Sequence, residues 1–295
     1  MADDRSPDLV VVSAEPFNAE TPLHEQFGLI TPTRRHYVRS HFTVPSWPGR
    51  LVVDGAVRHQ LTLSLVDLEA MPSSTMLVTL ECAGNGRAFL DPPCPEEQWG
   101  LGAVSTAEWT GVPLADVLRL AEPEDRAVEV RFAGADQGTP KALGRSISYE
   151  RSLPIAEVRD GEVLLAYAMN GERLTADHGA PLRLVVPRAY GMASVKWLAR
   201  ITALCVPFQG FFQRDRYVID GAPLGPIAPR AIIVSPVEGT RVNGDGFLVR
   251  GYAWSAVAPI KEVAVSDDAS RTWHAAELGP SRTARAWCEW SSRYI

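Results

Sequence analysis

The chain has 295 residues, of which 46% are hydrophobic and 22% charged, and its formal net charge is -6 at pH 7. This composition excludes collagen, coiled coils and wholesale disorder, and the acidic balance argues against nucleic acid or an anionic membrane as the main partner. The longest unbroken apolar stretch, Val163–Met169, is far shorter than the roughly 20 residues that a membrane-spanning helix needs.

Residues 1–36 predict an extended arm rather than a signal peptide, because the segment starts acidic and holds only a short apolar run. No apolar segment follows the Arg34-Arg35 pair, which argues against a twin-arginine export signal. The cysteines lie far apart without CxxC spacing, so they predict neither a disulfide framework nor a zinc site. We therefore expect a cytoplasmic protein. The cysteines are Cys82, Cys94, Cys205 and Cys288.

Strands and short helices alternate irregularly through the first three quarters of the chain. Ser64–Met71 predicts a helix with Ser64 as N-cap and Asp67 in the capping-box position, and Val112–Leu120 predicts a second helix with a proline near its start. The absence of a regular βαβ order favours an α+β fold over a doubly wound sheet. The predicted strands are Leu51–Val57 (strand, turn, strand), Met76–Glu81, Val128–Phe132, Val163–Met169 and Leu182–Val186.

A Gly/Pro-rich stretch, Ile219–Pro229, predicts a linker between two domains, residues 1–225 and residues 226–295. Short β-type runs at regular spacing follow it and predict a small Ig-like β-sandwich. About five strands are visible where such a sandwich usually has about seven, so we expect an incomplete sandwich with an open edge. The runs are Ala231–Ser235, Phe247–Ser255, Lys261–Ser266, Thr272–Leu278 and Ala286–Tyr294.

Cys82 is the first candidate for chemistry, because it follows a predicted buried strand and opens a loop with glycines at positions 84 and 86. Arg87 would favour the thiolate, the form that binds a metal or attacks carbon. A buried cysteine acting as a small hydrophobic residue fits the placement equally well. Phe89 breaks the GxGxxG pattern, so a dinucleotide loop is not supported.

Basic side chains recur at three places that could share one site. Arg39 and His41 would point to one face of an extended segment, although a surface arginine and a core histidine would look the same. His178, Arg183 and Lys196 together would suit a phosphate if their loops converge. A nucleophilic set of Cys82, His178 and Asp177 is a further alternative, but nothing local specifies it.

Several separated segments in this order resemble the sulfite oxidase family of molybdenum enzymes, in particular its bacterial, haem-free members. The resemblance runs from about residue 20 to 220 and continues weakly into the C-terminal part. It implies a mixed α/β molybdopterin-binding domain followed by the β-sandwich, which normally makes the dimer. The segments are Tyr37–Pro45, Thr79–Arg87, Trp99–Trp109, Leu165–Gly171, Asp177–Arg183, Ser194–Trp197 and Gly251–Ser255.

The resemblance implies one molybdenum per chain, held by a single molybdopterin and by the thiolate of Cys82, a soft ligand that suits a redox metal. It implies a small oxyanion substrate held by Arg39, Arg87 and Trp99, with Tyr217 beside the metal, and these residues together with Cys82 form the catalytic set. The implied cofactor-binding residues are Tyr37, Arg39, His41, Cys82, Asp136, His178, Arg183, Ser194, Val195 and Lys196.

The implied reaction is oxidation of sulfite to sulfate, with electrons passed to an external acceptor such as a cytochrome or dioxygen. Reduction of nitrate or another oxyanion, and a catalytically silent cofactor-binding module, are the alternatives. The chain departs from the family pattern in three ways. Ala256–Ile260 lacks the arginine that the family places near there, Gly86 replaces a basic residue, and the predicted sandwich is short, which leaves a homodimer open.

Overall fold

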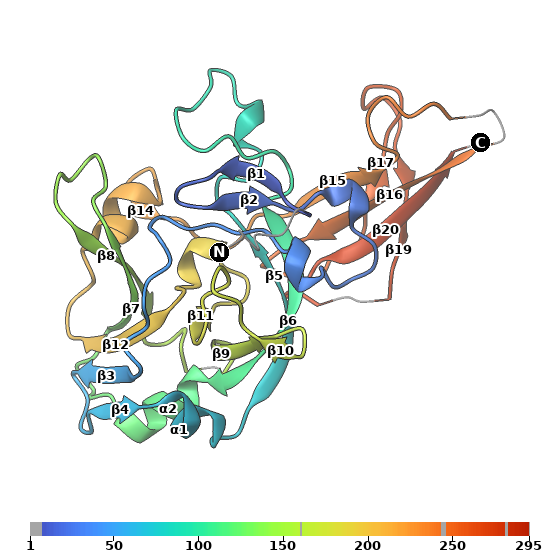
Figure 1. Ribbon diagram of the computed structural model, residues 1–295. Coiled ribbons are helices and arrows are strands. Elements are labelled where there is room, and N and C mark those ends of the chain that lie inside the picture. Colours follow the sequence, from blue (N-terminus) through green and yellow to red (C-terminus); the bar gives the residue numbers. More distant parts are fainter. Residues whose placement is uncertain (1–7, 160, 243–245, 281–282, 295) are drawn as a thin grey trace.

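The computed structural model describes residues 8–294 except 160, 243–245 and 281–282, so residues 1–7 of the predicted arm lie outside the described residues. Within this part of the chain, strands greatly outnumber α-helices (Figure 1). The helices are α1 (Leu65–Glu69) and α2 (Leu114–Ala121), and short helical turns lie at η1 (Leu23–Glu25), η2 (Thr33–Arg35), η3 (Arg87–Phe89), η4 (Gly191–Ala193) and η5 (Phe212–Arg216).

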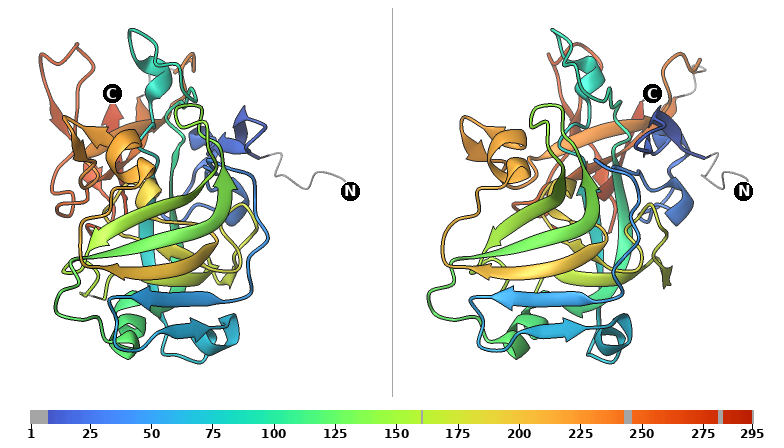
Figure 2. Two further views of the ribbon diagram at one scale, coloured as in Figure 1. Left: turned by 90° about the vertical axis from the view of Figure 1, so that its left-hand side faces the viewer. Right: turned by 60° about the vertical axis from the view of Figure 1, so that its left-hand side comes forward.

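Two mixed or antiparallel sheets of five strands build the N-terminal part. One has the order β4-β3-β12-β7-β8, in which β3 and β12 run parallel, and Figure 2 shows these strands side by side. The other has the order β10-β9-β6-β5, and β11 also pairs with β9. The bounds are β3 (Leu51–Gly55), β4 (Leu61–Leu63), β5 (Ser74–Glu81), β6 (Val104–Pro113), β7 (Glu129–Gly138), β8 (Ile147–Pro154), β9 (Leu164–Met169), β10 (Glu172–Arg173), β11 (Arg183–Val185) and β12 (Leu198–Leu204).

The N-terminal arm adds a small hairpin of β1 (Val10–Ser13) and β2 (Asn18–Glu20). An isolated antiparallel bridge joins Ala19, in β2, to Val38. The bridge fixes the extended segment that carries Arg39 and His41 against the body of the protein.

The helix starts differ from the predictions in one case and agree in the other. The Ser64 hydroxyl accepts from the Asp67 backbone N–H, and the Asp67 carboxylate accepts from the Ser64 backbone N–H, which confirms the predicted capping box. The second helix was predicted from Val112, but β6 continues through Pro113 because Val112 and Pro113 pair with Leu165 and Leu164 of β9. Tertiary pairing therefore overrides the local helix signal.

One further prediction is corrected. Leu51–Val57 forms a single strand up to Gly55, because its hydrogen-bonding partners are β4 and β12 rather than a second half of its own. At the start of the stretch Ile219–Pro229, β13 (Val218–Ile219) and β14 (Ala222–Pro223) pair as a tight hairpin, and the role of this stretch as a linker stays a prediction.

The C-terminal strands form a four-stranded antiparallel sheet, β15-β16-β20-β19, and a separate two-stranded ribbon of β17 and β18. The run Thr272–Leu278, predicted as one strand, divides between the ribbon and the sheet. The Ig-like sandwich and the boundary at residues 225/226 stay predictions. The bounds are β15 (Arg230–Ser235), β16 (Phe247–Trp254), β17 (Ala264–Val265), β18 (His274–Ala275), β19 (Glu277–Leu278) and β20 (Cys288–Tyr294).

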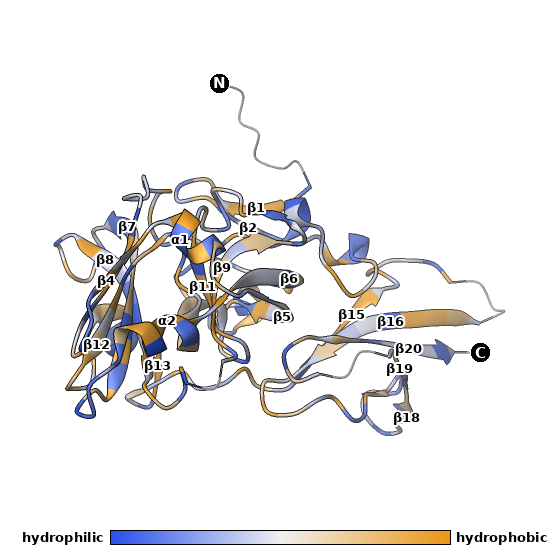
Figure 3. Cartoon of the chain, turned by 90° about the horizontal axis from the view of Figure 1, so that it is seen from below, coloured by the Kyte–Doolittle hydropathy of each residue, from blue (hydrophilic) through white to orange (hydrophobic). Residues whose placement is uncertain are grey.

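Strands β5 and β6 lie in the centre of the molecule, between the β3–β12 sheet on one side and the C-terminal sheet on the other (Figure 3). Fully buried Trp99 and Trp109 pack with Leu80 and Cys82 in a hydrophobic cluster on this central sheet. The carboxyl end of β5 is therefore held from both sides. None of the helices in the described ranges combines the length and apolar character that crossing a bilayer takes.

Candidate functional site

A cavity opens where β5 ends, and we call it the inner cavity. Its walls come from the segment after η2, the loop that follows β5, the inward end of β7 and the loops around β11 and η4. Segments far apart in sequence therefore meet here. The lining residues are His36, Tyr37, Arg39, Ser40, His41, Leu80, Cys82, Ala83, Asp136, Tyr149, Asp177, His178, Arg183, Gly191, Met192, Ser194, Lys196, Trp197 and Tyr217.

Cys82 stands at the mouth of this cavity, in the first position after β5. Its backbone N–H donates to the carbonyl of Ala103, which directly precedes β6, and the Gly84 N–H donates to its Sγ over 3.4 Å. Burial raises the pKa of the Cys82 thiol, and Arg39 opposes this shift more strongly than Arg87 does. Burial outweighs the two arginines, so the pKa of the thiol is raised overall, although Arg87 lowers it in the expected direction.

The segment 37–41 presents Tyr37, Arg39 and His41 to the inner cavity, as its extended backbone predicts. The Arg39 guanidinium also contacts the Asn18 side chain over 3.3 Å and the Ser40 carbonyl. Asn18 lies in β2, so the N-terminal hairpin positions the arginine.

His41 and Tyr217 form the shortest link between this segment and the chain after η5, with 2.6 Å between Nε2 and the phenol oxygen. Burial lowers the pKa of His41 well below its usual range, so the imidazole is neutral. Arg39 Nη2 lies 3.1 Å from His41 Nδ1 and 3.4 Å from His41 Nε2, so the guanidinium faces both ring nitrogens. Arg39, His41 and the Tyr217 hydroxyl therefore form one buried polar cluster.

Lys196 and Asp136 are two buried ionisable side chains of the inner cavity. Lys196 Nζ donates to the Ser40 hydroxyl over 2.6 Å and to the Asp177 carbonyl over 2.8 Å. Asp136 Oδ1 is buried and has no hydrogen-bond partner among the described residues. The β7–β8 pairing is interrupted between Ala133 and Gln137, and Asp136 lies in this irregular stretch. Burial lowers the pKa of Lys196 to about 7 and raises that of Asp136 to about 7.

Arg183 is the second buried cation of the cavity. Its guanidinium donates to the carbonyls of His178 (3.1 Å) and Ser194 (3.2 Å) and lies 4.7 Å from the ring centre of Trp109. Burial lowers its pKa to about 10. His178 is neutral, since burial lowers its pKa, and its Nε2 donates to the Thr33 carbonyl.

Cationic side chains with carbonyl and hydroxyl partners, together with an unpartnered carboxylate oxygen, are what a large anionic ligand with its own donors would need. The inner cavity fits such a ligand. It fits a Cys-His-Asp nucleophilic set poorly, because the His178 ring faces the Thr33 carbonyl and the His36 ring instead.

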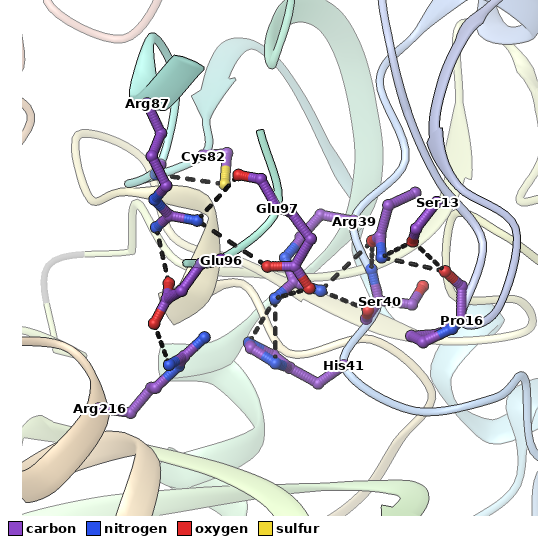
Figure 4. Close-up of polar contacts among 12 residues, drawn as sticks. Ser13, Pro16, Arg39, Ser40, His41, Cys82, Arg87, Glu96, Glu97 and Arg216 are labelled. Carbon is purple, nitrogen blue, oxygen red and sulfur yellow. Dashed lines mark hydrogen bonds and ion pairs between the residues drawn. The ribbon is translucent and has the colours of Figure 1, made fainter. Parts of the chain in front are cut away.

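A second pocket lies on the other side of Cys82, and we call it the arginine pocket. Arg39, Cys82 and Tyr217 line both pockets, so they mark the border between them. Figure 4 shows the charged side chains that meet there. The lining residues are Arg39, Cys82, Ala83, Gly84, Arg87, Glu96, Arg216, Tyr217, Val218 and Leu224.

Carboxylates neutralise much of the charge in the arginine pocket. Glu96 pairs with Arg87 over 3.0 Å and also with Arg216. Glu97 lies 3.4 Å from Arg39 Nη2 and 3.8 Å from Arg87 Nη1. Both glutamates come from the loop between η3 and β6, so this loop folds over the arginines.

The C-terminal sheet reaches the cysteine loop from behind. Glu81, nearly fully buried, accepts from Arg230 Nη1 over 2.8 Å and from Trp254 Nε1 over 2.7 Å. Arg230 also donates to the Asn85 carbonyl over 3.0 Å. Gly86 has a φ of +85°, and a Cβ there would lie 2.6 Å from Arg230 Nη2. The guanidinium of Arg230 thus stands where a side chain at position 86 would be.

Most of the predicted site residues meet around Cys82, and three segments do not join them. Trp99 is buried behind the loop and is not among the described residues that line either pocket. Val195 is buried too, and its carbonyl accepts from Leu184, so it supports its neighbours from within the fold. Ala256 and Val257, from the stretch without the expected arginine, line a different groove.

Sequence reasoning missed three groups of site residues. Arg216 stands directly before Tyr217, and that adjacency was a usable signal. Glu96 and Glu97 carried no signal, because their partners are 9 or more positions away in a loop without periodicity. Tyr149 was also missed; its ring stacks on His41 with 5.3 Å between ring centres, and its hydroxyl donates to the Met192 carbonyl.

Comparison with known proteins agrees with this geometry. Residues 41–212 match the family model described as the oxidoreductase molybdopterin binding domain. The chain is 37% identical to the mitochondrial sulfite oxidase of Rattus norvegicus over 97% of its own length, and it spans 57% of that relative. It is 31% identical to an NADH nitrate reductase of Cichorium intybus, covering 97% of this chain and 35% of that one.

Among solved structures, the sulfane dehydrogenase SoxCD from Paracoccus pantotrophus superposes with a TM-score of 0.84 at 27% identity, over 96% of this chain and 73% of that one. The resemblance read from the sequence motifs is confirmed. The chain belongs to the sulfite oxidase family of molybdopterin-dependent oxidoreductases.

Proposed function

We propose that the chain binds one molybdopterin-held molybdenum through Cys82 and oxidises sulfite to sulfate. The observation that carries the proposal is the position of Cys82 on the border between the inner cavity and the arginine pocket. One cysteine is thus offered to a cofactor on one side and to a small anion on the other.

The residues of the inner cavity fit the cofactor. Lys196, Arg183 and Ser194 would hold its phosphate, since they supply cationic or hydroxyl donors that line the cavity. The Asp136 oxygen without a partner would accept from the N–H groups of the pterin. When bound, the cofactor supplies two-electron redox chemistry and oxygen-atom transfer.

In the arginine pocket the side chains bind and orient the substrate. Arg39 and Arg87 offer fixed guanidinium donors to the oxygens of a small oxyanion. Tyr217 offers its hydroxyl, which lines the pocket and lies 2.6 Å from His41 Nε2. The reaction consumes sulfite and one water and yields sulfate, two protons and two electrons. The electrons pass to an external acceptor, a cytochrome or dioxygen.

A second candidate is reduction of nitrate or another oxyanion. It is favoured by the similarity to a nitrate reductase and by the glutamates that reduce the positive charge of the arginine pocket. Assays run in both directions, with sulfite and an oxidant or with nitrate and a reductant, separate the two candidates.

The test is the molybdenum content of protein produced with molybdate in a host that makes the cofactor, beside the Cys82→Ser variant. We expect about one molybdenum per chain and sulfite-dependent reduction of an acceptor in the wild type, and loss of turnover in the variant with an unchanged fold by circular dichroism. Sulfite oxidation retained by Cys82→Ser would refute the ligand role. Protein that contains no molybdenum and shows no turnover would support the alternative of a catalytically silent module.

A further inference from the structure

The net positive charge of the arginine pocket is smaller than its number of arginines, because carboxylates lie beside them. Arg39, Arg87 and Arg216 carry three positive charges, and Glu96 and Glu97 oppose them with two negative charges at ion-pair distance. One positive charge is left for a ligand. Figure 4 shows that the Glu96 carboxylate lies between Arg87 and Arg216 and that of Glu97 between Arg87 and Arg39.

These ion pairs are not free surface contacts. The side chains of Arg39 and Arg87 are 13% and 16% exposed, and those of Glu96 and Glu97 are 27% and 25% exposed. Partly buried charges are screened by salt much less than exposed ones. The charge of each carboxylate is therefore felt at the place where the oxygens of a substrate would bind.

We propose that Glu96 and Glu97 are specificity-determining residues that set the arginine pocket for a singly charged oxyanion. The inference rests on the proposed function, because it takes the arginine pocket as the substrate site. A monoanion such as hydrogensulfite brings the pocket to neutrality, whereas a dianion leaves one uncompensated negative charge or has to displace a carboxylate. The balance from hydrogensulfite and water is sulfate, three protons and two electrons.

The same arrangement disfavours the product. Oxidation turns a monoanion into doubly charged sulfate at the moment when the reaction is complete. The two carboxylates then repel the product from the site that attracted the substrate. Glu96 and Glu97 therefore affect both the selection of the substrate and the release of the product, without contacting the reacting atoms.

The experiment measures anion affinity by calorimetric titration of sodium sulfate and sodium nitrate into the purified full chain with its cofactor, at constant ionic strength. Glu96→Gln, Glu97→Gln and the double variant are compared with the wild type. Glu108→Gln is the matched control, because Glu108 is exposed on β6 and changes the net charge of the chain by the same unit outside the pocket. Glu97→Asp keeps the charge.

A change of electrostatic potential acts on a dianion twice as strongly as on a monoanion. We expect the double variant to bind nitrate about 5-fold and sulfate about 25-fold more tightly than the wild type. Glu97→Asp and Glu108→Gln should keep the wild-type ratio. In turnover assays, the inhibition constant of sulfate should fall in the same variants.

Equal gains for both anions, no gain, or no measurable binding of either anion by the double variant would overturn the proposal. The titrations need no turnover. If the protein oxidises sulfite but the double variant does not favour sulfate over nitrate as expected, only this inference fails. If the double variant shows that difference but the protein does not oxidise sulfite, only the proposed reaction fails.

Discussion

The two pockets that meet at Cys82 treat their cationic side chains differently. In the inner cavity, Lys196 and Arg183 donate to hydroxyl and carbonyl oxygens and lie deep in the fold. In the arginine pocket, Arg87 and Arg216 face carboxylates of the same loop. Both pockets are lined by basic side chains. In the inner cavity their charge is available to a ligand, whereas carboxylates of the protein neutralise most of it in the arginine pocket.

This difference fits two kinds of ligand, one that stays bound and one that leaves after each turnover. A cofactor that stays bound is best held by cations whose partners in the protein are neutral oxygens, because their charge is then available to the ligand. A substrate that leaves after each turnover is better served by arginines with a competing partner. The balance of positive and negative charge, rather than the number of arginines, thus distinguishes a site that retains its ligand from a site that releases it.

Tyr217, on the border of the two pockets, gives the largest expected effect. Tyr217→Phe removes the hydroxyl that His41 orients, and we expect kcat for sulfite to fall by about 100-fold, as for loss of one donor to a reacting oxyanion. The free energy of unfolding should change by only about 1 kcal/mol, since one hydrogen bond is lost. Steady-state kinetics and chemical denaturation measure the two effects. A strongly destabilised variant with normal kcat would make Tyr217 a structural residue.

Lys196, a buried cation of the inner cavity, gives the second-largest expected effect. Lys196→Met removes a charge that donates to no carboxylate, and we expect the purified protein to retain about 10-fold less molybdopterin, the loss of one charge-assisted hydrogen bond. Cofactor content is measured by fluorescence of the released, oxidised pterin. Arg216→Met, from the arginine pocket, is the matched control and should keep its cofactor. Equal losses in both variants would erase the distinction between the pockets.

The smallest effect is a pH dependence of stability in protein prepared without cofactor. Because burial raises the pKa of Asp136 to about 7, the native state binds more protons than the unfolded state between about pH 4 and pH 7. Stability from this group therefore falls as pH rises through that window. We expect Asp136→Asn to gain about 1–2 kcal/mol relative to wild type between pH 5 and pH 8. Urea denaturation at both pH values decides it, and a pH-independent difference would contradict it.

Local signals predicted those parts of the fold and site that depend on near neighbours. The capping box at Ser64, the strand that ends at Glu81 and the shared face of Arg39 and His41 all follow from short-range spacing. Motif order then placed Asp136, His178 and Lys196 in one site, although nothing in their spacing required it. The structure brings them together through the irregular end of β7 and the loops around β11.

Long-range pairing accounts for what could not be predicted. The strand extension that takes Val112 and Pro113 out of the second helix depends on β9, more than 50 residues away. The ion pair of Arg216 with Glu96 spans 120 positions. The predicted roles of Trp99 and Val195 stay predictions; both side chains lie behind the residues that line the pockets.

The contact of Arg230 and Trp254 with Glu81 has a consequence for how the chain can be divided. Two residues of the C-terminal sheet hold the carboxylate that directly precedes Cys82, and Arg230 fills the space beside Gly86. A fragment that stops before β15 would leave Glu81 buried with a negative charge and two fewer donors. The loop that carries Cys82 is therefore shaped by contacts from the C-terminal sheet as well as by its own residues, so a change in that sheet at Arg230 or Trp254 also changes the surroundings of the cysteine.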